Sequence, residues 1–120
     1  MSEVLFDYHA VKSGLITSRP LSVCDYDRIV DNGSRLLKVQ IKSTTSFDKA
    51  RGDSYIFRIG GMKNGVESTY KGRVDFMALH IIPTGDWFIV PEGDIPPGTS
   101  MRIRNNGKWM AYKNNWEVLK

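Results

Sequence analysis

The chain has 120 residues, of which 41% are hydrophobic and 25% are charged, and its formal net charge is +4. This composition predicts one compact globular domain over residues 1–120, and it excludes a membrane protein because no apolar stretch approaches the length of a span. The one cysteine, Cys24, excludes an internal disulfide and suits a reducing, cytoplasmic location, while the modest basic excess permits nucleic-acid binding without requiring it.

The first segment has the pattern of a helix, expected over residues 3–13. Its apolar residues recur with helical spacing and form one face: Val4, Leu5, Tyr8 and Val11. Ser2 is expected as the N-cap, because its hydroxyl can accept a hydrogen bond from the first exposed amides, and Gly14 as the C-cap. Pro20 then interrupts the chain.

Strands are expected to follow. Apolar alternation predicts them at residues 24–31, 34–45, 53–60, 74–82 and 87–91. The polar, glycine-containing segment 61–73 indicates a loop or a ragged strand end, and residues 83–86 have the composition of a turn. The tail is expected to end in a short helix. A helix followed by strands and a short helical tail predicts a mixed α/β (α+β) domain.

The first two strands are predicted to form a hairpin around Asn32 and Gly33, the strongest short-range signal for a two-residue turn. In that register Asp27 lies opposite Lys38. Because side chains alternate along a strand, one face becomes polar, with Asp25, Asp27, Lys38, Gln40 and Lys42. The other face is expected to join the core, with Tyr26, Val30, Leu37, Val39 and Ile41.

The polar face offers the chemistry of a metal-dependent hydrolase. Asp27 and Gln40 are diagonal neighbours with Cβ atoms on the order of 7 Å apart, so their oxygens can reach one ion. A carboxylate and an amide oxygen are hard ligands that suit Mg²⁺. Lys42 lies on the same face and can orient a water or stabilise charge on a phosphate. The plain alternative is that Asp27 flanks a strand start and that Lys38 and Lys42 form a solvated face.

These residues resemble the D…(E/Q)xK signature of the PD-(D/E)xK nuclease superfamily, through Asp27 and then Gln40-Ile41-Lys42. The resemblance extends to Glu3 in the first helix, to SRPL at 18–21, and to Tyr70 with the later strands VDFMALH and WFIVP. In these features the chain resembles group I intron-associated homing endonucleases and Holliday junction resolvase-like proteins. This resemblance covers nearly all of the chain.

The resemblance implies a restriction-endonuclease-like core, with a central mixed sheet flanked by helices. It implies that Asp27, Gln40 and the backbone carbonyl of Ile41 bind the metal, that Lys42 is catalytic and that Glu3 is an auxiliary ligand acting through water. The cofactor it implies is Mg²⁺, with Mn²⁺ able to substitute. Gln40 departs from the usual glutamate, and a neutral amide is a poorer Mg²⁺ ligand, which points to weak metal affinity or to metal recruited together with DNA.

The expected activity is Mg²⁺-dependent hydrolysis of DNA, of junction-resolving or homing type. The expected partner is duplex or branched DNA, contacted by Lys38, Arg102 and Arg104, and no membrane. Since one active site cuts one strand, a homodimer or a higher symmetric oligomer is expected. The alternative is a non-catalytic DNA-binding or accessory module that retains the nuclease fold.

Overall fold

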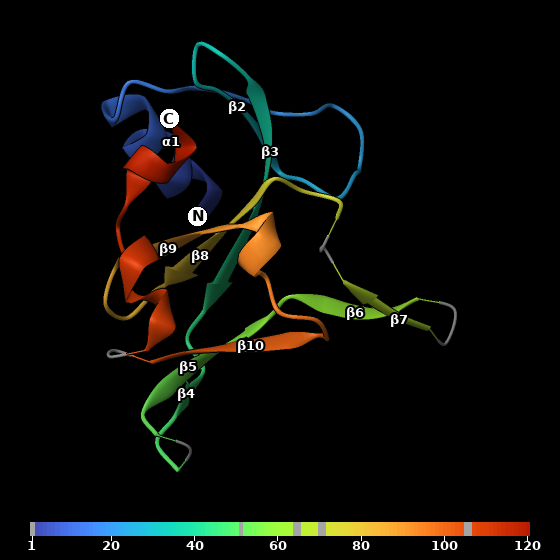
Figure 1. Ribbon diagram of the computed structural model, residues 1–120, viewed down its shortest axis with the longest axis vertical. Coiled ribbons are helices and arrows are strands. Elements are labelled where there is room, and N and C mark those ends of the chain that lie inside the picture. The colour runs from blue at the N-terminus through green and yellow to red at the C-terminus, as the bar shows by residue number, and fades with distance from the viewer. Residues whose placement is uncertain (1, 51, 64–65, 70–71, 105–106) are drawn as a thin grey trace.

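A mixed five-stranded sheet forms the centre of the computed structural model, which describes residues 2–50, 52–63, 66–69, 72–104 and 107–120 (Figure 1). In spatial order its strands are β1 (Ile16–Ser18), β2 (Arg28–Asp31), β3 (Leu36–Thr44), β8 (Phe76–Ile81) and β9 (Asp86–Pro91). β3 and β8 run parallel, and the other neighbours run antiparallel. The predicted mixed sheet is confirmed, and the two apolar segments near residue 80 form its β8–β9 hairpin.

Two smaller sheets extend from this centre. One contains β4 (Phe47–Asp48), β5 (Ser54–Arg58) and β10 (Ser100–Arg104), and the other contains β6 (Gly60–Lys63) and β7 (Val66–Thr69). β6 and β7 occupy most of the segment expected as a loop or a ragged strand end, and Tyr70 lies outside the described residues. β10 falls in a segment for which the sequence predicted no strand.

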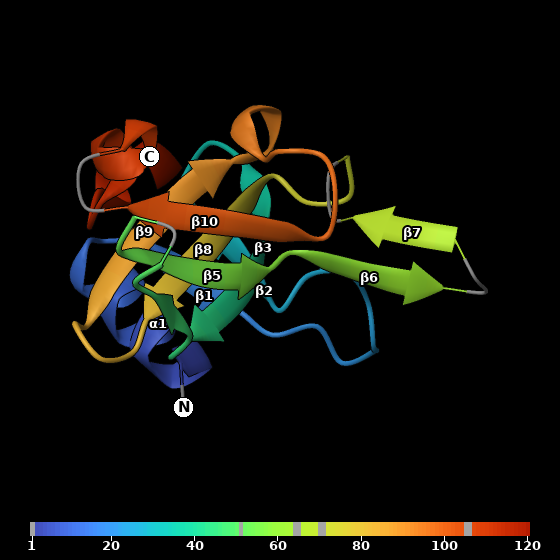
Figure 2. The ribbon, with the colours of Figure 1, turned by 90° about the horizontal axis from the view of Figure 1, so that it is seen from below.

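The central sheet separates two hydrophobic clusters. On one face it packs against α1 (Ser2–Lys12) and the 3-10 turn η3 (Trp116–Leu119), and on the other against β5 and β10, which cross the central strands (Figure 2). β8 shows the division, because Ala78 faces α1 while Met77 and Leu79 face the β5–β10 sheet. The remaining short 3-10 turns are η1 (Glu92–Asp94) and η2 (Lys108–Tyr112).

The helix α1 buries a different side from the one that its apolar spacing suggests. Phe6 and Ala10 are fully buried, whereas three members of the predicted apolar face are more than half exposed: Val4, Tyr8 and Val11. Gly14 has a φ of +90°, as expected of a residue that ends a helix. The N-cap prediction for Ser2 was wrong: Ser2 lies within the helix, and its hydroxyl bonds His80 Nδ1 at 2.9 Å. No helix in the described part of the chain is long and apolar enough to cross a membrane.

The β2–β3 hairpin forms as predicted, but its register is shifted by two residues. Ile29, rather than Asp27, is the partner of Lys38. The turn is centred on Gly33 and Ser34, because the Asn32 amide donates to the Arg35 carbonyl and the Asn32 side chain accepts from the amides of Ser34 and Arg35. A shift of two residues preserves which side chains share a face. Lys38, Gln40 and Lys42 therefore still point to the same side of β3.

The hairpin departs from simple alternation where β2 begins. Arg28 is the partner of Val39, and the Asp27 amide also donates to the Val39 carbonyl at 2.9 Å, so two residues face one, as in a β-bulge. The extra residue reverses the alternation before it. Tyr26 consequently packs toward the β5–β10 sheet, with Lys38 Nζ 5.7 Å from its ring centroid. Its predicted place on the core face with Val30 was wrong for this reason.

Candidate active site

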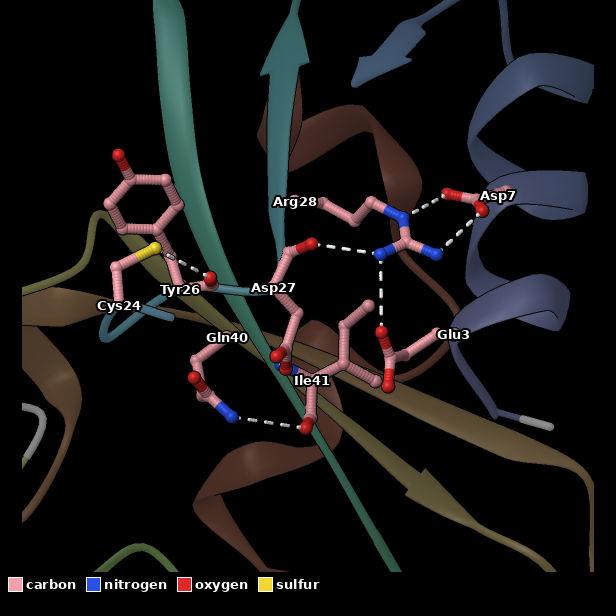
Figure 3. A network of polar contacts seen from close by, with 8 residues as sticks. All are labelled: Glu3, Asp7, Cys24, Tyr26, Asp27, Arg28, Gln40 and Ile41. Carbon is pink, nitrogen blue, oxygen red and sulfur yellow. Dashed lines mark hydrogen bonds and ion pairs between the residues drawn. The ribbon is translucent and has the colours of Figure 1, made fainter. Parts of the chain in front are cut away.

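The candidate site includes the part of β3 that follows Val39. The β2–β3 ladder ends at the pair of Arg28 and Val39, so the backbone of Ile41 finds its partners among side chains. Asp27 Oδ2 accepts from the Ile41 amide at 2.9 Å, and Gln40 Nε2 donates to the Ile41 carbonyl at 3.3 Å (Figure 3). The two side chains predicted as metal ligands therefore meet at the backbone of Ile41.

Arg28 ties the helix to the site. It is 3% exposed and forms a two-bond pair with Asp7, from Nε to Oδ1 at 2.8 Å and from Nη2 to Oδ2 at 3.0 Å. Its Nη1 donates to Glu3 Oε1 at 3.1 Å and to the Asp27 carbonyl at 2.8 Å (Figure 3). The hydrogen bonds that Arg28 donates to Asp7 are the largest influence on the pKa of Arg28 and raise it above its ordinary value. This set of Arg28, Asp7, Glu3 and the Asp27 carbonyl is called the site cluster below.

The carboxyl group of Asp27 lies in an electrostatically mixed environment. Burial is the largest influence and raises its pKa above the ordinary value, the hydrogen bond from Ile41 lowers it, and the nearby Glu3 carboxylate raises it again. Lys42 and Arg28 act in the opposite direction. Glu3 and Lys42 are therefore each close enough to Asp27 to act on its carboxyl group.

A cleft of about 260 Å³ opens beside Asp27. Glu3 and Arg28 line one part of it, and the loop that precedes β2 lines the rest, including Arg19 and Cys24. Lys42 is half-buried, while Gln40 is buried, with 7% of its surface exposed. On the polar face predicted for β3, Gln40 is thus buried, Lys42 is half-buried and Lys38 is exposed.

The donor atoms at this site suit a hard divalent cation. They are a carboxylate, a backbone carbonyl and an amide oxygen, with the second carboxylate of Glu3 near enough to raise the Asp27 pKa. Among the described residues, no three His, Cys, Asp or Glu side chains are grouped to hold a metal, so a cation here depends on Gln40 and Ile41. A cation at the Ile41 carbonyl would compete with the hydrogen bond from the Gln40 amide, and a rotation of that amide would direct its oxygen toward the cation instead.

The residues predicted to contact DNA lie on two different strands. Lys38 is exposed on β3, whereas Arg102 and Arg104 project from the outer face of β10, since the alternating Met101 and Ile103 are buried. Arg102 Nη1 donates to Asp48 Oδ2 at 3.0 Å and to Ser54 Oγ at 3.2 Å. We call Arg102, Asp48 and Ser54 the outer cluster. Arg104 lies over Gly52, where an added Cβ would be 3.1 Å from its Nε.

The comparisons with known proteins agree with this geometry. The family model described as PD-(D/E)XK endonuclease matches residues 1–119, and the chain belongs to that family. Among solved structures it is similar to a bacterial homing endonuclease, I-Ssp6803I, with a TM-score of 0.77 and 22% sequence identity over 93% of this chain and 83% of the other. That likeness confirms the restriction-endonuclease-like fold. No curated protein matches the chain.

Sequence reasoning missed two members of the site cluster, Arg28 and Asp7. Arg28 follows Asp27 directly, so simple alternation placed it on the side opposite the site. Asp7 is one helical turn after Glu3, and that i, i+4 spacing was the available signal that both acids lie on one side of α1. Arg58 was missed as well, although it joins Arg102 and Arg104 on the same outer face as the partner of Ser100.

Proposed function

We propose that this protein is a Mg²⁺-dependent endonuclease that hydrolyses phosphodiester bonds in DNA, with Mn²⁺ able to substitute. The observation that supports it best is the meeting of Asp27 and Gln40 at the backbone of Ile41, with Lys42 beside them. Asp27, Gln40 and the Ile41 carbonyl would hold the cation. When bound, it supplies positive charge that polarises a phosphate oxygen.

The chain's own residues have separate tasks in this proposal. Lys42 places an ammonium beside the Asp27 carboxylate, where it can donate to a phosphate oxygen as negative charge develops or hold an attacking water. Arg28 donates hydrogen bonds to the Asp27 carbonyl and the Glu3 carboxylate, so it holds the two acidic residues near each other in a fixed orientation. Glu3 is the auxiliary acid, because it is 52% exposed and reaches the cleft from α1.

DNA would contact the basic residues Lys38, Arg102 and Arg104 through its phosphates, which carry charge but no sequence information. A domain of 120 residues has little area for reading bases, which favours cutting directed by DNA structure, although homing-type cutting of a duplex is the other form that the family resemblance implies. Cutting both strands needs two active sites, so a homodimer is proposed.

The test is cleavage of a four-way junction, a supercoiled plasmid and single-stranded DNA, each with Mg²⁺, with Mn²⁺ and with EDTA. Asp27→Asn should abolish cleavage and preserve DNA binding, because the basic surface is unchanged. The matched control is Asp25→Asn, which alters an exposed aspartate two residues away that pairs with Arg73 at 3.6 Å. Cleavage by Asp27→Asn at the parental rate would contradict the proposed site.

One observation favours the alternative of a DNA-binding or accessory module. Gln40 donates to the Ile41 carbonyl, so two of the three proposed ligands are bonded to each other. Salt-dependent binding to DNA without cleavage under any of these metal conditions would support that alternative.

A further inference from the structure

The loop between β1 and β2 exposes two apolar residues completely. Leu21 and Val23 are as exposed as in an extended peptide, at 104% and 105%, whereas the next most exposed large apolar residue in the described ranges is Leu36 at 66%. A single exposed leucine is ordinary on a protein surface, but two fully exposed apolar residues within three positions are not explained by packing of the domain. Leu21 and Val23 are called the apolar tip below.

The apolar tip lies beside the candidate active site, on a loop that projects from the side of the central sheet (Figure 1). The cleft next to Asp27 is lined by Glu3 from α1 and by Arg28 from β2. The loop contributes the other lining residues, which include Arg19, Pro20, Ser22, Val23 and Cys24. Val23 is therefore part of the cleft wall, and Leu21 lies between two residues of that wall.

This position identifies DNA as the molecule that reaches the apolar tip. A phosphodiester held at Asp27 carries a nucleotide on each side, and successive nucleotides of one strand rise by only about 3.4 Å. Because the loop walls the cleft, the nucleotides beside the scissile phosphate must pass the tip. Residues 13–24 contain no acid and one cation, Arg19, so the loop does not repel phosphates.

The chemistry of the two side chains decides which part of DNA they contact. Leucine and valine cannot form hydrogen bonds with phosphates or with the polar edges of bases. The largest apolar surface that DNA offers is the face of a base, which is accessible only where stacking with the next base is broken. Apolar side chains, leucine among them, insert at such steps as wedges.

We propose that Leu21 and Val23 insert between bases beside the scissile phosphate, so that the protein selects DNA in which this base step is already unstacked. The inference rests on the proposed nuclease function and adds the feature of DNA that the site takes. In a fully paired duplex the tip must first break the stacking of a base step, whereas at a mismatch most of that cost is absent. Selection then depends on how easily the DNA deforms and not on its base sequence.

The first test compares affinity for a short duplex with one central mismatch and for the same duplex fully paired, by fluorescence anisotropy in EDTA. The wild-type chain should bind the mismatched duplex about tenfold more tightly. Leu21→Ser should bind the two duplexes within about twofold of each other, because the wedge is gone. Leu21 buries almost no surface in the fold, so this variant should keep the wild-type melting temperature.

The matched control is Leu36→Ser, the same substitution at a leucine five residues before Ile41, roughly 17 Å away along β3. It should keep the preference for the mismatch. Because the proposed contact is apolar, Leu21→Ser should also leave the slope of log affinity against log salt unchanged. Equal binding of both duplexes by the wild-type chain, a full preference in Leu21→Ser, or an equal loss in Leu36→Ser would overturn the proposal.

The native Cys24 measures whether DNA covers the loop, because it is exposed and follows Val23 directly. Its reaction with N-ethylmaleimide should slow by at least about fivefold when the mismatched duplex is bound, since a thiol reacts only while it is accessible. The control is Val11→Cys in a Cys24→Ser background, at a position 59% exposed on the outer side of α1, and it should react equally with and without DNA.

The outcomes separate this inference from the nuclease function. Unchanged reactivity of Cys24 at a DNA concentration that saturates the anisotropy signal would overturn the inference and leave the nuclease function standing. Absence of any binding to either duplex would contradict the nuclease function, and the inference with it.

Discussion

The two arginine clusters of this protein differ in burial, and the difference separates two roles. In the site cluster Arg28 is 3% exposed, and all three of its nitrogens are engaged by Asp7, Glu3 and the Asp27 carbonyl. In the outer cluster the Arg102 side chain is 30% exposed, and one nitrogen contacts Asp48 and Ser54. A buried, fully engaged guanidinium holds structure together, whereas a surface pair exchanges its acid for another anion at small cost.

This contrast explains why charge in the sequence was a poor guide to burial. Arg102 stands out in a basic stretch and was predicted to bind DNA, while Arg28 follows an acid in an apolar strand and was not selected. The structure assigns Arg28 the more central place, because it joins α1 to the strand end that carries Asp27. Five predictions test or sharpen this contrast, in decreasing order of expected effect.

Replacing Arg28 should have the largest effect. Arg28→Met should lower the free energy of unfolding by about 3 kcal/mol, since it leaves the partly buried Asp7 carboxylate without its cation. Arg102→Met should lower it by at most about 1 kcal/mol, as for a surface pair. Urea unfolding at pH 7 measures both. Equal losses would show that the two clusters do not differ in the way their burial indicates.

Replacing Lys42 should leave the fold intact and impair the chemistry. Lys42→Ala is expected to reduce the single-turnover cleavage rate by on the order of 10²-fold, the scale for a positioned proton-transfer or charge-stabilising group. Lys38→Ala is the control for the loss of one positive charge, because Lys38 lies on the same face of β3 as Lys42 and its Nζ is 5.7 Å from the Tyr26 ring centroid. An unchanged rate for Lys42→Ala at saturating Mg²⁺ would remove Lys42 from the mechanism.

Gln40→Glu should tighten Mg²⁺ binding and make stability depend more on the metal. Glutamate cannot donate to the Ile41 carbonyl and brings another carboxylate near Asp27 and Glu3, so without metal the melting temperature should fall, and with Mg²⁺ it should recover. The Mg²⁺ concentration for half-maximal cleavage should fall as well, although the rate need not rise. Gln40→Ala should need more Mg²⁺ than either. Identical metal dependence in all three proteins would mean that residue 40 does not touch the ion.

The outer cluster should affect DNA affinity and leave cleavage chemistry unchanged. Arg102→Ala is expected to weaken binding to all DNA sequences alike and to reduce the slope of log affinity against log salt by about 1. Asp48→Asn should do the reverse and tighten binding, because Arg102 then loses its competing acid. Fluorescence anisotropy between low and moderate salt measures both. Unchanged affinity in both variants would place the DNA elsewhere.

The smallest effect concerns His80, whose hydrogen bond with Ser2 attaches the start of α1 to the sheet. α1 is the helix that carries Glu3 and Asp7. Burial lowers the pKa of His80 below its ordinary value, so the unfolded chain binds a proton near pH 6.5 that the folded chain does not. Stability should therefore fall as the pH drops below about 6.5. His80→Phe keeps an aromatic ring against Trp87, which stacks on His80 at 4.3 Å, and should flatten this dependence in unfolding measured between pH 7.5 and 5.5. An equally steep dependence in the variant would assign it to other groups.

By itself, the sequence determined the local features. Alternation placed Lys38, Gln40 and Lys42 on one side of β3, apolar runs located the β8–β9 hairpin, and Gly14 marked the end of the first helix. The nuclease motif could be recognised from the sequence because Asp27, Gln40 and Lys42 lie within one short segment, the predicted hairpin. All of these depend on neighbours within a few residues, where side-chain period and turn composition act directly.

The tertiary structure alone decided how those pieces meet. The register of the hairpin came from the side-chain bonds of Asn32, and the bulge at Asp27 and Arg28 reversed the direction of Tyr26. Which side of α1 is buried was set by the sheet beneath it, since Phe6 and Ala10 fill that space while the more regular stripe of Val4, Tyr8 and Val11 remains outside. Arg28 acquired its role because packing α1 on the sheet removes its guanidinium from water, and a buried charge must find its partners among whichever acids the fold brings to it.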